Sequence, residues 1–259
     1  MIAQTDQRIA VVTGGSSGIG LSTVRRLAME GYRVAFFGKT PSRVDAAAET
    51  FTAEFGKDVI FHRCVDISEP TAIADFFDAV RNHWGSPDTL ICNAGISPKN
   101  ADGQASPFMG TPLKEWNQVL STNLMGPVLC CQYVLPDLMR RRFGRIILIG
   151  SIAGRTIPKL AGASYTTSKA ALAGCLRSLV MTLNGTGVTA NLVAPGHIVT
   201  GMTGPIDSDV NQHARSRIPV GRLGNPEDVA NLIAFLVSDD AGFINGATID
   251  VNGGEFVPL

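Results

Sequence analysis

The sequence has no excess of charge of either sign. Its 259 residues contain 22 Lys and Arg against 22 Asp and Glu, so the formal net charge is zero. Proteins that rely on broad attraction to phosphates carry a basic surplus, so the balance speaks against a nucleic-acid partner. A hydrophobic fraction of 45% and a charged fraction of 17% exclude a disordered chain.

Long apolar runs and an export signal are also missing. No stretch reaches the roughly 18 uncharged apolar residues that a membrane-spanning helix needs, so no membrane association is expected. The first residues, MIAQTDQRIAVVTGG, lack a basic segment followed by a long apolar one. We therefore expect no export signal and a cytoplasmic protein.

Cysteine and histidine are few and form no pattern. None of the five cysteines belongs to a CxxC pair, and the adjacent Cys130 and Cys131 cannot form an ordinary disulfide. We expect five buried, reduced thiols. The four histidines show neither HxxxH nor HExxH spacing, so no metal site is expected.

What the sequence does have is a regular alternation of short apolar runs with helical patterns. Nearly continuous apolar runs are typical of parallel strands that helices cover on both faces. We expect strands at 8–13, 33–37, 58–62, 88–92, 144–150, 187–194 and 247–251. We expect helices at 18–30, 41–55, 70–83, 112–142, 163–183 and 226–237. Within the fourth helix, Pro127 and Pro136 are expected to bend or break the chain.

This alternation predicts one α/β domain over residues 1–259, a doubly wound, Rossmann-like parallel sheet with helices on both faces. The longest segment without expected structure, 195–225, has the length of a substrate lid. A second polar loop, 97–111, follows the fourth strand. Both loops follow the carboxyl ends of strands, where open α/β sheets bind ligands.

A glycine-rich turn, TGGSSGIG at 13–20, follows the first strand. Its G-x-x-x-G-x-G spacing is neither the commoner GxGxxG fingerprint nor a P-loop. Glycine lets the backbone approach a pyrophosphate, and the following helix offers unpaired N–H groups and a positive dipole end. The turn therefore predicts binding of a dinucleotide phosphate, with a tight turn without ligand as the alternative. The candidate contacts are Gly14, Ser16, Ser17, Gly18, Ile19 and Gly20.

The end of the second strand bears on the choice of cofactor. Many dinucleotide sites place an acid there for the adenosine ribose. Here Gly38 and Lys39 stand instead, and a lysine attracts the 2′-phosphate that a carboxylate would repel. This favours NADP(H), with NAD(H) as the alternative if Lys39 is an ordinary solvated lysine.

Tyr165 and Lys169 are four residues apart in a helical pattern, so they share one helix face. An ammonium roughly 4–5 Å from a phenolate stabilises it by about 3–4 kcal/mol, which predicts a tyrosine pKa lowered from about 10 towards working pH. An incidental surface pair is the alternative. Ser151 follows an apolar strand, where its hydroxyl can hydrogen-bond a carbonyl oxygen that gains charge.

In order and spacing, these features resemble the short-chain dehydrogenase/reductase family over essentially the whole chain. The resemblance rests on TGGSSGIG at 13–20, Asp66-Ile67, Asn93-Ala94-Gly95, Asn123, Ser151, YTTSK at 165–169 and PGHIVT at 195–200. Within the family, the chain is most similar to the 3-oxoacyl-[acyl-carrier-protein] reductase branch. The C-terminal segment VGRLGNPEDVANLIAFLVSDDAGFINGATIDVNGG supports this.

The resemblance implies a role for each catalytic candidate. Tyr165 is the implied general acid in carbonyl reduction and the base in the reverse direction, and Ser151 orients the substrate oxygen. Lys169 binds the nicotinamide ribose and lowers the pKa of the tyrosine. Asn123 holds a water in a proton relay to Lys169.

The resemblance also implies cofactor contacts and an assembly. Asp66 and Ile67 would lie at the adenine, and Asn93, Ala94 and Gly95 along the adenosine side. The nicotinamide carboxamide would be held by Pro195, Gly196, Ile198 and Thr200. The assembly implied is a homotetramer.

Two features depart from the carrier-protein reductases. The segment 179–187 carries no charge, whereas an acidic carrier protein needs a basic docking surface. The loop 97–111 is a few residues longer than in the carrier-protein reductases. The dense basic cluster of Arg140, Arg141, Arg142 and Arg145 is the alternative docking surface, or a solvated helix end.

We therefore expect an NADP(H)-dependent oxidoreductase that interconverts a carbonyl and a secondary alcohol, with a 3-oxoacyl thioester as the leading substrate. One alternative is a dehydrogenase of a sugar, polyol or other small secondary alcohol, with NAD as cofactor. An alternative of another class is a nucleotide-sensing regulator that does no chemistry, against which the complete set of Asn123, Ser151, Tyr165 and Lys169 argues.

Overall fold

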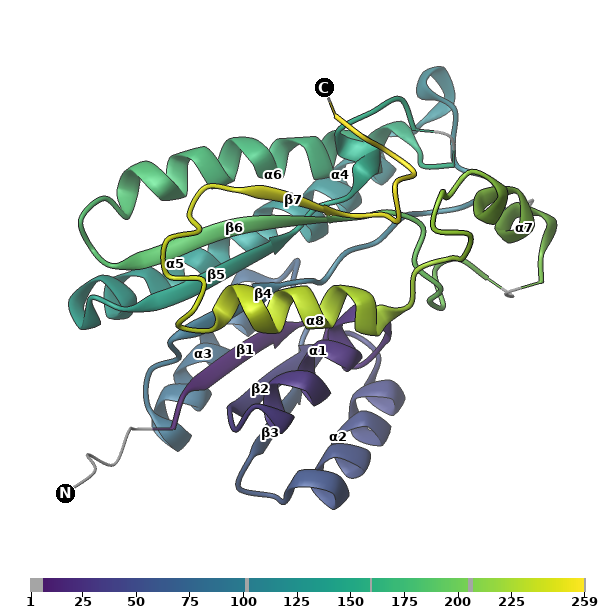
Figure 1. Ribbon diagram of the computed structural model, residues 1–259. Coiled ribbons are helices and arrows are strands. Elements are labelled where there is room, and N and C mark those ends of the chain that lie inside the picture. The colour runs from purple at the N-terminus through teal and green to yellow at the C-terminus, as the bar shows by residue number, and fades with distance from the viewer. Residues whose placement is uncertain (1–6, 101–102, 159, 205–206, 259) are drawn as a thin grey trace.

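The computed structural model describes residues 7–100, 103–158, 160–204 and 207–258, and these contain one seven-stranded parallel sheet (Figure 1). The strand order is β3-β2-β1-β4-β5-β6-β7. The strands are β1 (Ile9–Thr13), β2 (Arg33–Gly38), β3 (Ile60–Cys64), β4 (Thr89–Cys92), β5 (Gly144–Ile149), β6 (Val188–Pro195) and β7 (Thr248–Val251). The predicted doubly wound parallel sheet is confirmed.

Helices cover both faces of this sheet, as Figure 1 shows. They are α1 (Gly18–Met29), α2 (Pro41–Phe55), α3 (Pro70–Trp84), α4 (Leu113–Leu120), α5 (Gly126–Arg141), α6 (Ala163–Thr182), α7 (Asp209–Ser216) and α8 (Pro226–Val237). One hydrophobic core joins the sheet to α3, α5 and α6, and a second joins it to α1, α2 and α8.

The apolar strands supply both cores at once. Side chains alternate between the two faces of a strand. In β1, Val11 belongs to the core under α3, α5 and α6, while Val12 belongs to the core under α1, α2 and α8, and both are fully buried. A strand buried on both faces needs apolar residues at successive positions, which explains the continuous runs in the sequence.

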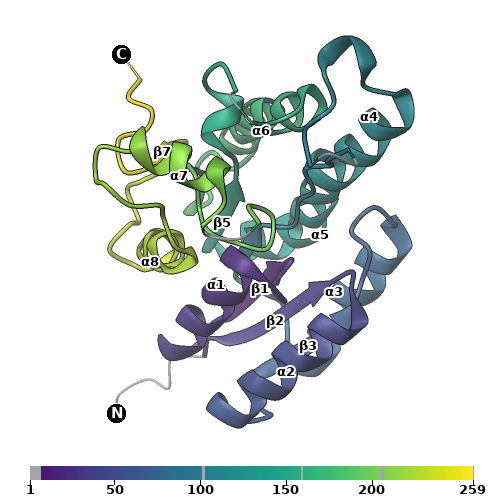
Figure 2. The same cartoon turned by 90° about the vertical axis from the view of Figure 1, so that its right-hand side faces the viewer.

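The sheet order reverses beside β1, and this reversal positions the site. β1 lies between β2 and β4, so the chain after β1 and the chain after β4 leave in opposite directions from neighbouring strands. In open α/β sheets, a ligand crevice forms at this point, outside the carboxyl ends of the strands. Figure 2 looks towards this edge, with α7 on one side and α4 on the other.

Three local expectations need correction. The predicted helix 112–142 is interrupted by a π-helical turn at Ser121–Met125, while Pro127 fits the first turn of α5 and Pro136 lies inside that helix. The third strand is 60–64 rather than 58–62. The segment 195–225, expected to lack structure, contains the short polar helix α7.

The cysteines are free, but they are not all buried. Cys92, Cys130 and Cys131 lie in the core, Cys175 is half-buried, and Cys64 is exposed. Cys64 ends β3, which is the edge strand and pairs with a neighbouring strand, β2, on one side only. The prediction of five buried thiols is therefore wrong at Cys64, and at Cys175 the thiol is only half-buried. Within the described ranges, no helix is both long and apolar enough to cross a membrane.

Candidate active site

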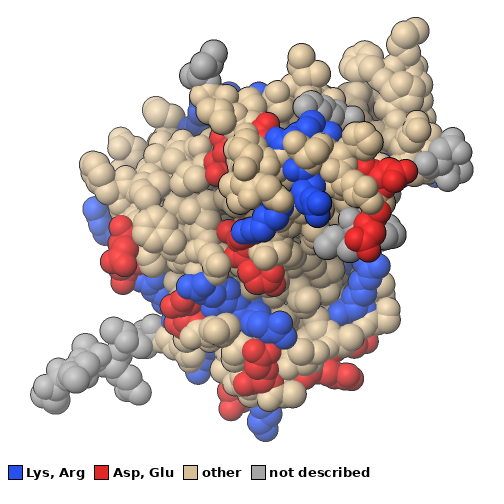
Figure 3. Space-filling view, turned by 45° about the vertical axis from the view of Figure 1, so that its right-hand side comes forward, with Lys and Arg blue, Asp and Glu red and all other residues tan. Residues whose placement is uncertain are grey.

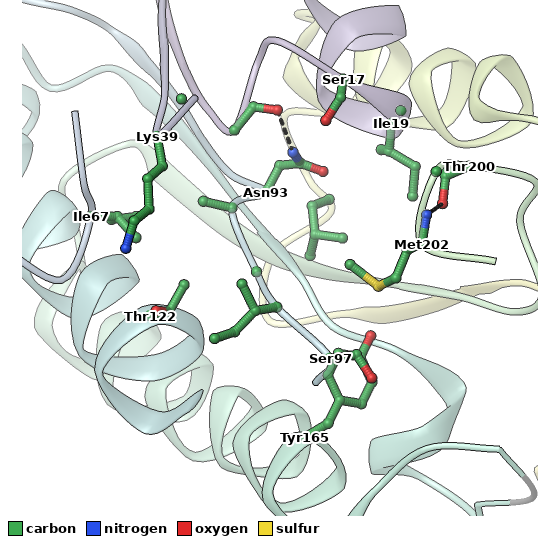
Figure 4. Close-up of a pocket in the computed structure, with 18 of the residues that line it drawn as sticks. Ser17, Ile19, Lys39, Ile67, Asn93, Ser97, Thr122, Tyr165, Thr200 and Met202 are labelled. Carbon is green, nitrogen blue, oxygen red and sulfur yellow. Dashed lines mark hydrogen bonds between the residues drawn. The ribbon is translucent and has the colours of Figure 1, made fainter. Parts of the chain in front are cut away.

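A cavity of about 1130 Å³ opens at the carboxyl edge of the sheet. Figure 4 shows Lys39 and Ile67 towards one end of it and Tyr165 and Met202 towards the other, with Asn93 between them. Predicted site residues that line the cavity are Gly14, Ser16, Ser17, Gly18, Ile19, Lys39, Asp66, Ile67, Asn93, Ala94, Gly95, Ser151, Tyr165, Lys169, Pro195, Gly196, Ile198 and Thr200. Gly20 and Asn123 do not line it; they lie behind its wall.

The turn between β1 and α1 needs glycine for two different reasons. Gly18 has φ +52°, the left-handed region that other residues avoid. A Cβ on Gly20 would overlap the carbonyl oxygen of Gly14, so only hydrogen fits there. Ser17 is the N-cap residue of α1, but its side chain accepts no hydrogen bond from the helix. The N–H groups of the first turn are therefore left without a capping side chain. These features fit a phosphate at the helix N-terminus.

Asn93 holds this turn against β4. Its Nδ2 donates to the carbonyl oxygens of Thr13 and Gly14, at 3.1 and 3.2 Å. In return, the Thr13 hydroxyl accepts hydrogen bonds from the backbone N–H groups of Asn93 and Ala94, both at 2.9 Å. The side chain of Asn93 therefore fixes the shape of the turn, in addition to lining the cavity.

At the other end of the cavity wall, Lys39 forms an ion pair with Asp66. The distance from Lys39 Nζ to Asp66 Oδ2 is 2.5 Å, and the lysine side chain is 71% exposed. The hydrogen bond to Asp66 raises the pKa of Lys39. Burial acts to raise the pKa of Asp66, but hydrogen bonds from Lys39 and Ser68 outweigh it, and the pKa is lowered. Lys39, the residue predicted to bind the 2′-phosphate, is thus paired with the carboxylate of Asp66 in this structure.

Asn123 acts from inside the protein. The π-helical turn carries it, fully buried, to the backbone of Ile96. Its Oδ1 accepts from Ile96 N at 2.8 Å, and its Nδ2 donates to Ile96 O at 2.9 Å and to Ser168 Oγ at 3.0 Å. The side chain of Asn123 therefore holds the chain after β4 in place, and its predicted role towards a water stays a prediction.

Lys169 is a buried cation in the cavity wall. It is only 6% exposed, and its Nζ donates to the carbonyl oxygen of Ile149 at 2.7 Å. A Cβ on Gly95 would lie 3.4 Å from this Nζ, so Lys169 reaches the turn after β4. Burial lowers the pKa of Lys169 to about 8.

Tyr165 departs from the electrostatic prediction. Burial raises its pKa, while a hydrogen bond with Ser151 acts to lower it without reversing the direction. Lys169 Nζ lies 5.7 Å from the centroid of the tyrosine ring and is bonded to Ile149 instead. The predicted lowering by Lys169 is therefore wrong for the protein without bound ligand. Ser151, directly after β5, also caps the following turn by accepting from Ala153 N at 3.1 Å.

Several cavity residues were not predicted. Ser97, Thr122, His197 and Met202 line the cavity beside the predicted set. Figure 4 shows Ser97 next to Tyr165 and Met202 next to Thr200. The two predicted functional loops, 97–111 and 195–225, contain three of these residues. The sequence signal thus located the segments but not the individual side chains.

The sheet, the glycine turn at its switch point and a serine, tyrosine and lysine around one cavity define a class, the oxidoreductases built on a Rossmann-like sheet. Residues 14–255 match the family model described as Enoyl-(Acyl carrier protein) reductase. The chain belongs to the short-chain dehydrogenase/reductase family.

Curated relatives align over nearly their whole length. The 3-oxoacyl-[acyl-carrier-protein] reductase FabG of Escherichia coli is 35% identical over 250 residues, covering 96% of this chain and 98% of that protein. The reductase of the same name from Staphylococcus aureus is 36% identical over 249 residues, with the same coverage.

Solved structures of the same architecture carry varied names. A short-chain dehydrogenase/reductase from Serratia marcescens has a TM-score of 0.86 at 30% identity, covering 96% of this chain and 98% of that one. A putative gluconate dehydrogenase from Agrobacterium tumefaciens has a TM-score of 0.88 at 26% identity and 97% coverage of both chains. A blue fluorescent protein from a metagenomic library, in complex with NADPH, has a TM-score of 0.86 at 29% identity, covering 96% of this chain and 98% of that one.

Proposed function

We propose that this protein is an NADP(H)-dependent reductase that converts the carbonyl of a 3-oxoacyl thioester to a secondary alcohol. The observation that carries the proposal is the meeting of Ser151, Tyr165 and Lys169 at one cavity wall. The chain aligns with 98% of the length of the curated relatives, and their names support this substrate class.

The chemistry follows from the protonation of the three side chains. Because burial raises the pKa of Tyr165, its hydroxyl keeps its proton at neutral pH and can donate it to an oxygen that gains negative charge. Ser151, hydrogen-bonded to that hydroxyl, can orient the same oxygen. Lys169 is still mostly cationic at pH 7 with a pKa of about 8, so it favours negative charge on the reacting oxygen.

The residues present fit a phosphorylated dinucleotide. The glycine turn and the first turn of α1 suit the pyrophosphate, and Lys39 offers a cation where the adenosine ribose would lie. A nicotinamide bound in the cavity would supply the hydride. The NADPH complex of a structural neighbour supports the choice of cofactor.

Exposed apolar side chains in the segment after Ser151 and on the cavity wall favour an acyl chain over a sugar. Ile157 and Leu160, in the segment after Ser151, are 87% and 40% exposed, and Met202 on the cavity wall is 51% exposed. Lys99 ties the two flanking segments together by donating to the carbonyl oxygen of Leu160 at 2.9 Å. A sugar or polyol dehydrogenase remains the second candidate, supported by the gluconate dehydrogenase name of a neighbour.

We further propose a cytoplasmic homotetramer. The apolar helix α6 supports an assembly, since its C-terminal half leaves Leu179 and Val180 half-buried and Met181 77% exposed. Light scattering on the purified protein tests it, and a monomeric mass would refute it.

A carbonyl panel assayed with NADPH and NADH tests the function. It contains 3-oxoacyl thioesters, sugar-derived ketones and simple ketones. Tyr165→Phe removes the proton and keeps the ring, so we expect turnover to fall at least about 10²-fold with NADPH binding retained. Binding of NADPH without turnover of any panel member would instead support the alternative of a nucleotide-sensing regulator that does no chemistry. Near-full turnover by Tyr165→Phe would refute the assigned acid.

A further inference from the structure

One contact in the lid joins the cavity wall to a buried amide. His197 follows Gly196 at the end of β6 and lines the cavity. Its Nε2 lies 2.6 Å from Oδ1 of Asn211, in the first turn of α7. Asn211 is fully buried, although α7 is a polar helix at the surface. A short contact to a buried side chain indicates a specific role for this pair.

The hydrogen-bond directions follow from the second partner of Asn211. Its Nδ2 donates to the carbonyl oxygen of Thr203 at 3.3 Å, which leaves Oδ1 as the acceptor for His197. His197 Nε2 is therefore the donor. One amide thus joins the strand exit at His197 to the 200–203 turn.

That turn is held by hydrogen bonds within it and reaches the glycine turn. Thr203 Oγ1 donates to Thr200 O and accepts from Thr200 N, both at 2.9 Å. Met202 N donates to Thr200 Oγ1 at 3.2 Å. A Cβ on Gly18 would lie 3.1 Å from Cγ2 of Thr200, so the turn packs against the N-terminus of α1. Asn211 therefore joins His197 to a turn that lines the cavity and packs against the glycine turn.

We propose that His197 and Asn211 form a latch that holds the 200–203 turn and α7 across the cavity, over the nicotinamide half of the dinucleotide. Both are positioning residues, because they act through Thr200 and Met202 rather than on the reacting atoms. The nicotinamide half as the bound group rests on the proposed function. The latch itself rests on the hydrogen bonds of Asn211 with His197 and Thr203. Loss of the latch should loosen the lid and weaken the nicotinamide half while sparing the adenosine half.

Hydrogen exchange of the protein without cofactor tests the latch independently of the cofactor assignment. In His197→Leu, we expect amides of the 200–203 turn and of 208–216 to exchange roughly five- to tenfold faster, the range for one lost hydrogen bond. His197→Gln keeps an N–H donor and should restore protection. His213→Leu changes a histidine on the exposed face of the same helix and should leave exchange of the 200–203 turn unchanged. Unchanged exchange in His197→Leu would overturn the proposal.

Binding measurements then place the effect in the cavity. NADPH titrations should show a roughly fivefold or greater loss in His197→Leu, with the affinity for 2′,5′-ADP, the adenosine half alone, unchanged. Asn211→Leu should match it, and the double variant should show no further loss, since the residues act as one unit. Additive losses, or an equal loss for 2′,5′-ADP, would overturn the latch. Failure of the unmodified protein to bind NADPH would refute the cofactor assignment, while the exchange result would still decide the latch.

Discussion

At the scale of single residues, the buried ammonium of Lys169 lowers the stability of the folded protein. A pKa lowered from 10.5 to about 8 means that burial in the folded protein destabilises the charged form of this side chain. The unfolded chain then binds more protons than the folded one between about pH 8 and pH 10.5, so the stability contributed at this site rises with pH across that window. Below pH 8, the full free-energy cost of burying the charged ammonium is present.

Lys169→Met should therefore make the protein without cofactor more stable at pH 7. The pKa displacement corresponds to roughly 3 kcal/mol, and loss of the bond to Ile149 offsets about 1 kcal/mol or more, leaving a gain of about 1–2 kcal/mol. Denaturant unfolding from pH 7 to pH 10.5 should show the advantage shrinking as the pH rises. Lys57→Met, at an exposed lysine, is the control. An advantage that stays constant with pH would contradict the assignment.

At the end of β2, we expect Gly38 to determine the choice of cofactor. The unmodified protein should prefer NADPH by roughly 5–30-fold in kcat/KM, and Lys39→Ala should mostly erase this preference. The exposed pair with Asp66 is weak enough for a phosphate to compete with it. Gly38→Asp should reverse the preference, because a carboxylate binds ribose hydroxyls and repels the 2′-phosphate.

The structure adds a condition to that experiment. A Cβ on Gly38 would overlap Ser16 Oγ, so Gly38→Asp is best made together with Ser16→Gly. Ser16→Gly alone is the control for the missing hydroxyl. A preference of the unmodified protein for NADH, or an unchanged ratio in Lys39→Ala, would show that Lys39 is an ordinary solvated lysine.

Residue types and spacing predicted which side chains share the cavity, but not their protonation. The interval from Tyr165 to Lys169 fixes a common helix face. It does not reveal how much protein surrounds the phenol, and burial is what raises the pKa of Tyr165. Likewise, Asn123 was found from its motif, while its contacts with Ile96 depend on a π-helical turn that has no simple sequence signal.

At the scale of elements, Glu115 joins α4 to α6. Its Oε1 accepts from the buried Ser164 on α6 at 2.8 Å, directly before Tyr165. Its Oε2 accepts from Ser106, in the loop before α4, at 2.9 Å. One carboxylate therefore fixes both the loop 97–111 and the first turn of α6.

Glu115→Ala should lower the free energy of unfolding by about 1–3 kcal/mol, because it leaves a buried hydroxyl without its acceptor. We also expect KM for the substrate to rise several-fold as the loop loosens. Glu115→Gln keeps one acceptor oxygen and should lose about half as much. Lys114→Ala, at the exposed neighbour, is the control. Unchanged stability and KM in Glu115→Ala would rule out this role.

Strands and long helices were predictable because the two-sided sheet demands apolar residues at every position. The predicted and observed bounds of β1, β2, β5 and β6 differ by one residue or less at each end. Helix α7 was missed because its sequence, DVNQHARS, has no apolar periodicity. Only two of its residues, Asn211 and Ala214, are buried, and tertiary contacts rather than local pattern hold it in place.

At the scale of the whole molecule, the distribution of charge bears on the partner. Arg140, Arg141 and Arg142 precede β5, whereas Ser151 follows it, so about 20 Å of strand separates them. Arg141 and Arg142 donate to the carbonyl oxygens of Ser86 and Gly185. Arg145 is 4% exposed and so does not belong to the surface cluster. On the face in Figure 3, cationic and anionic side chains are interspersed.

A carrier protein should therefore give little advantage. We expect a small 3-oxoacyl thioester to match the carrier-bound substrate in kcat/KM within about threefold, with little dependence on salt between 50 and 500 mM, because the mixed charges on the face in Figure 3 do not steer an acidic partner. The comparison uses the same acyl group on coenzyme A and on an acyl-carrier protein. A large advantage for the carrier-bound substrate that falls steeply with salt would restore a carrier-docking function.

The bond between Asn93 and the glycine turn has a consequence for the order of folding. The two partners are 80 residues apart in the chain, with α1, β2, α2, β3, α3 and β4 between them. Closing so long a loop is slow compared with forming the helices inside it. We therefore expect a newly made or refolding chain to form most of its first-half helix before the glycine turn takes shape. A nucleotide that depends on this turn would then bind only after the fourth strand has joined the first.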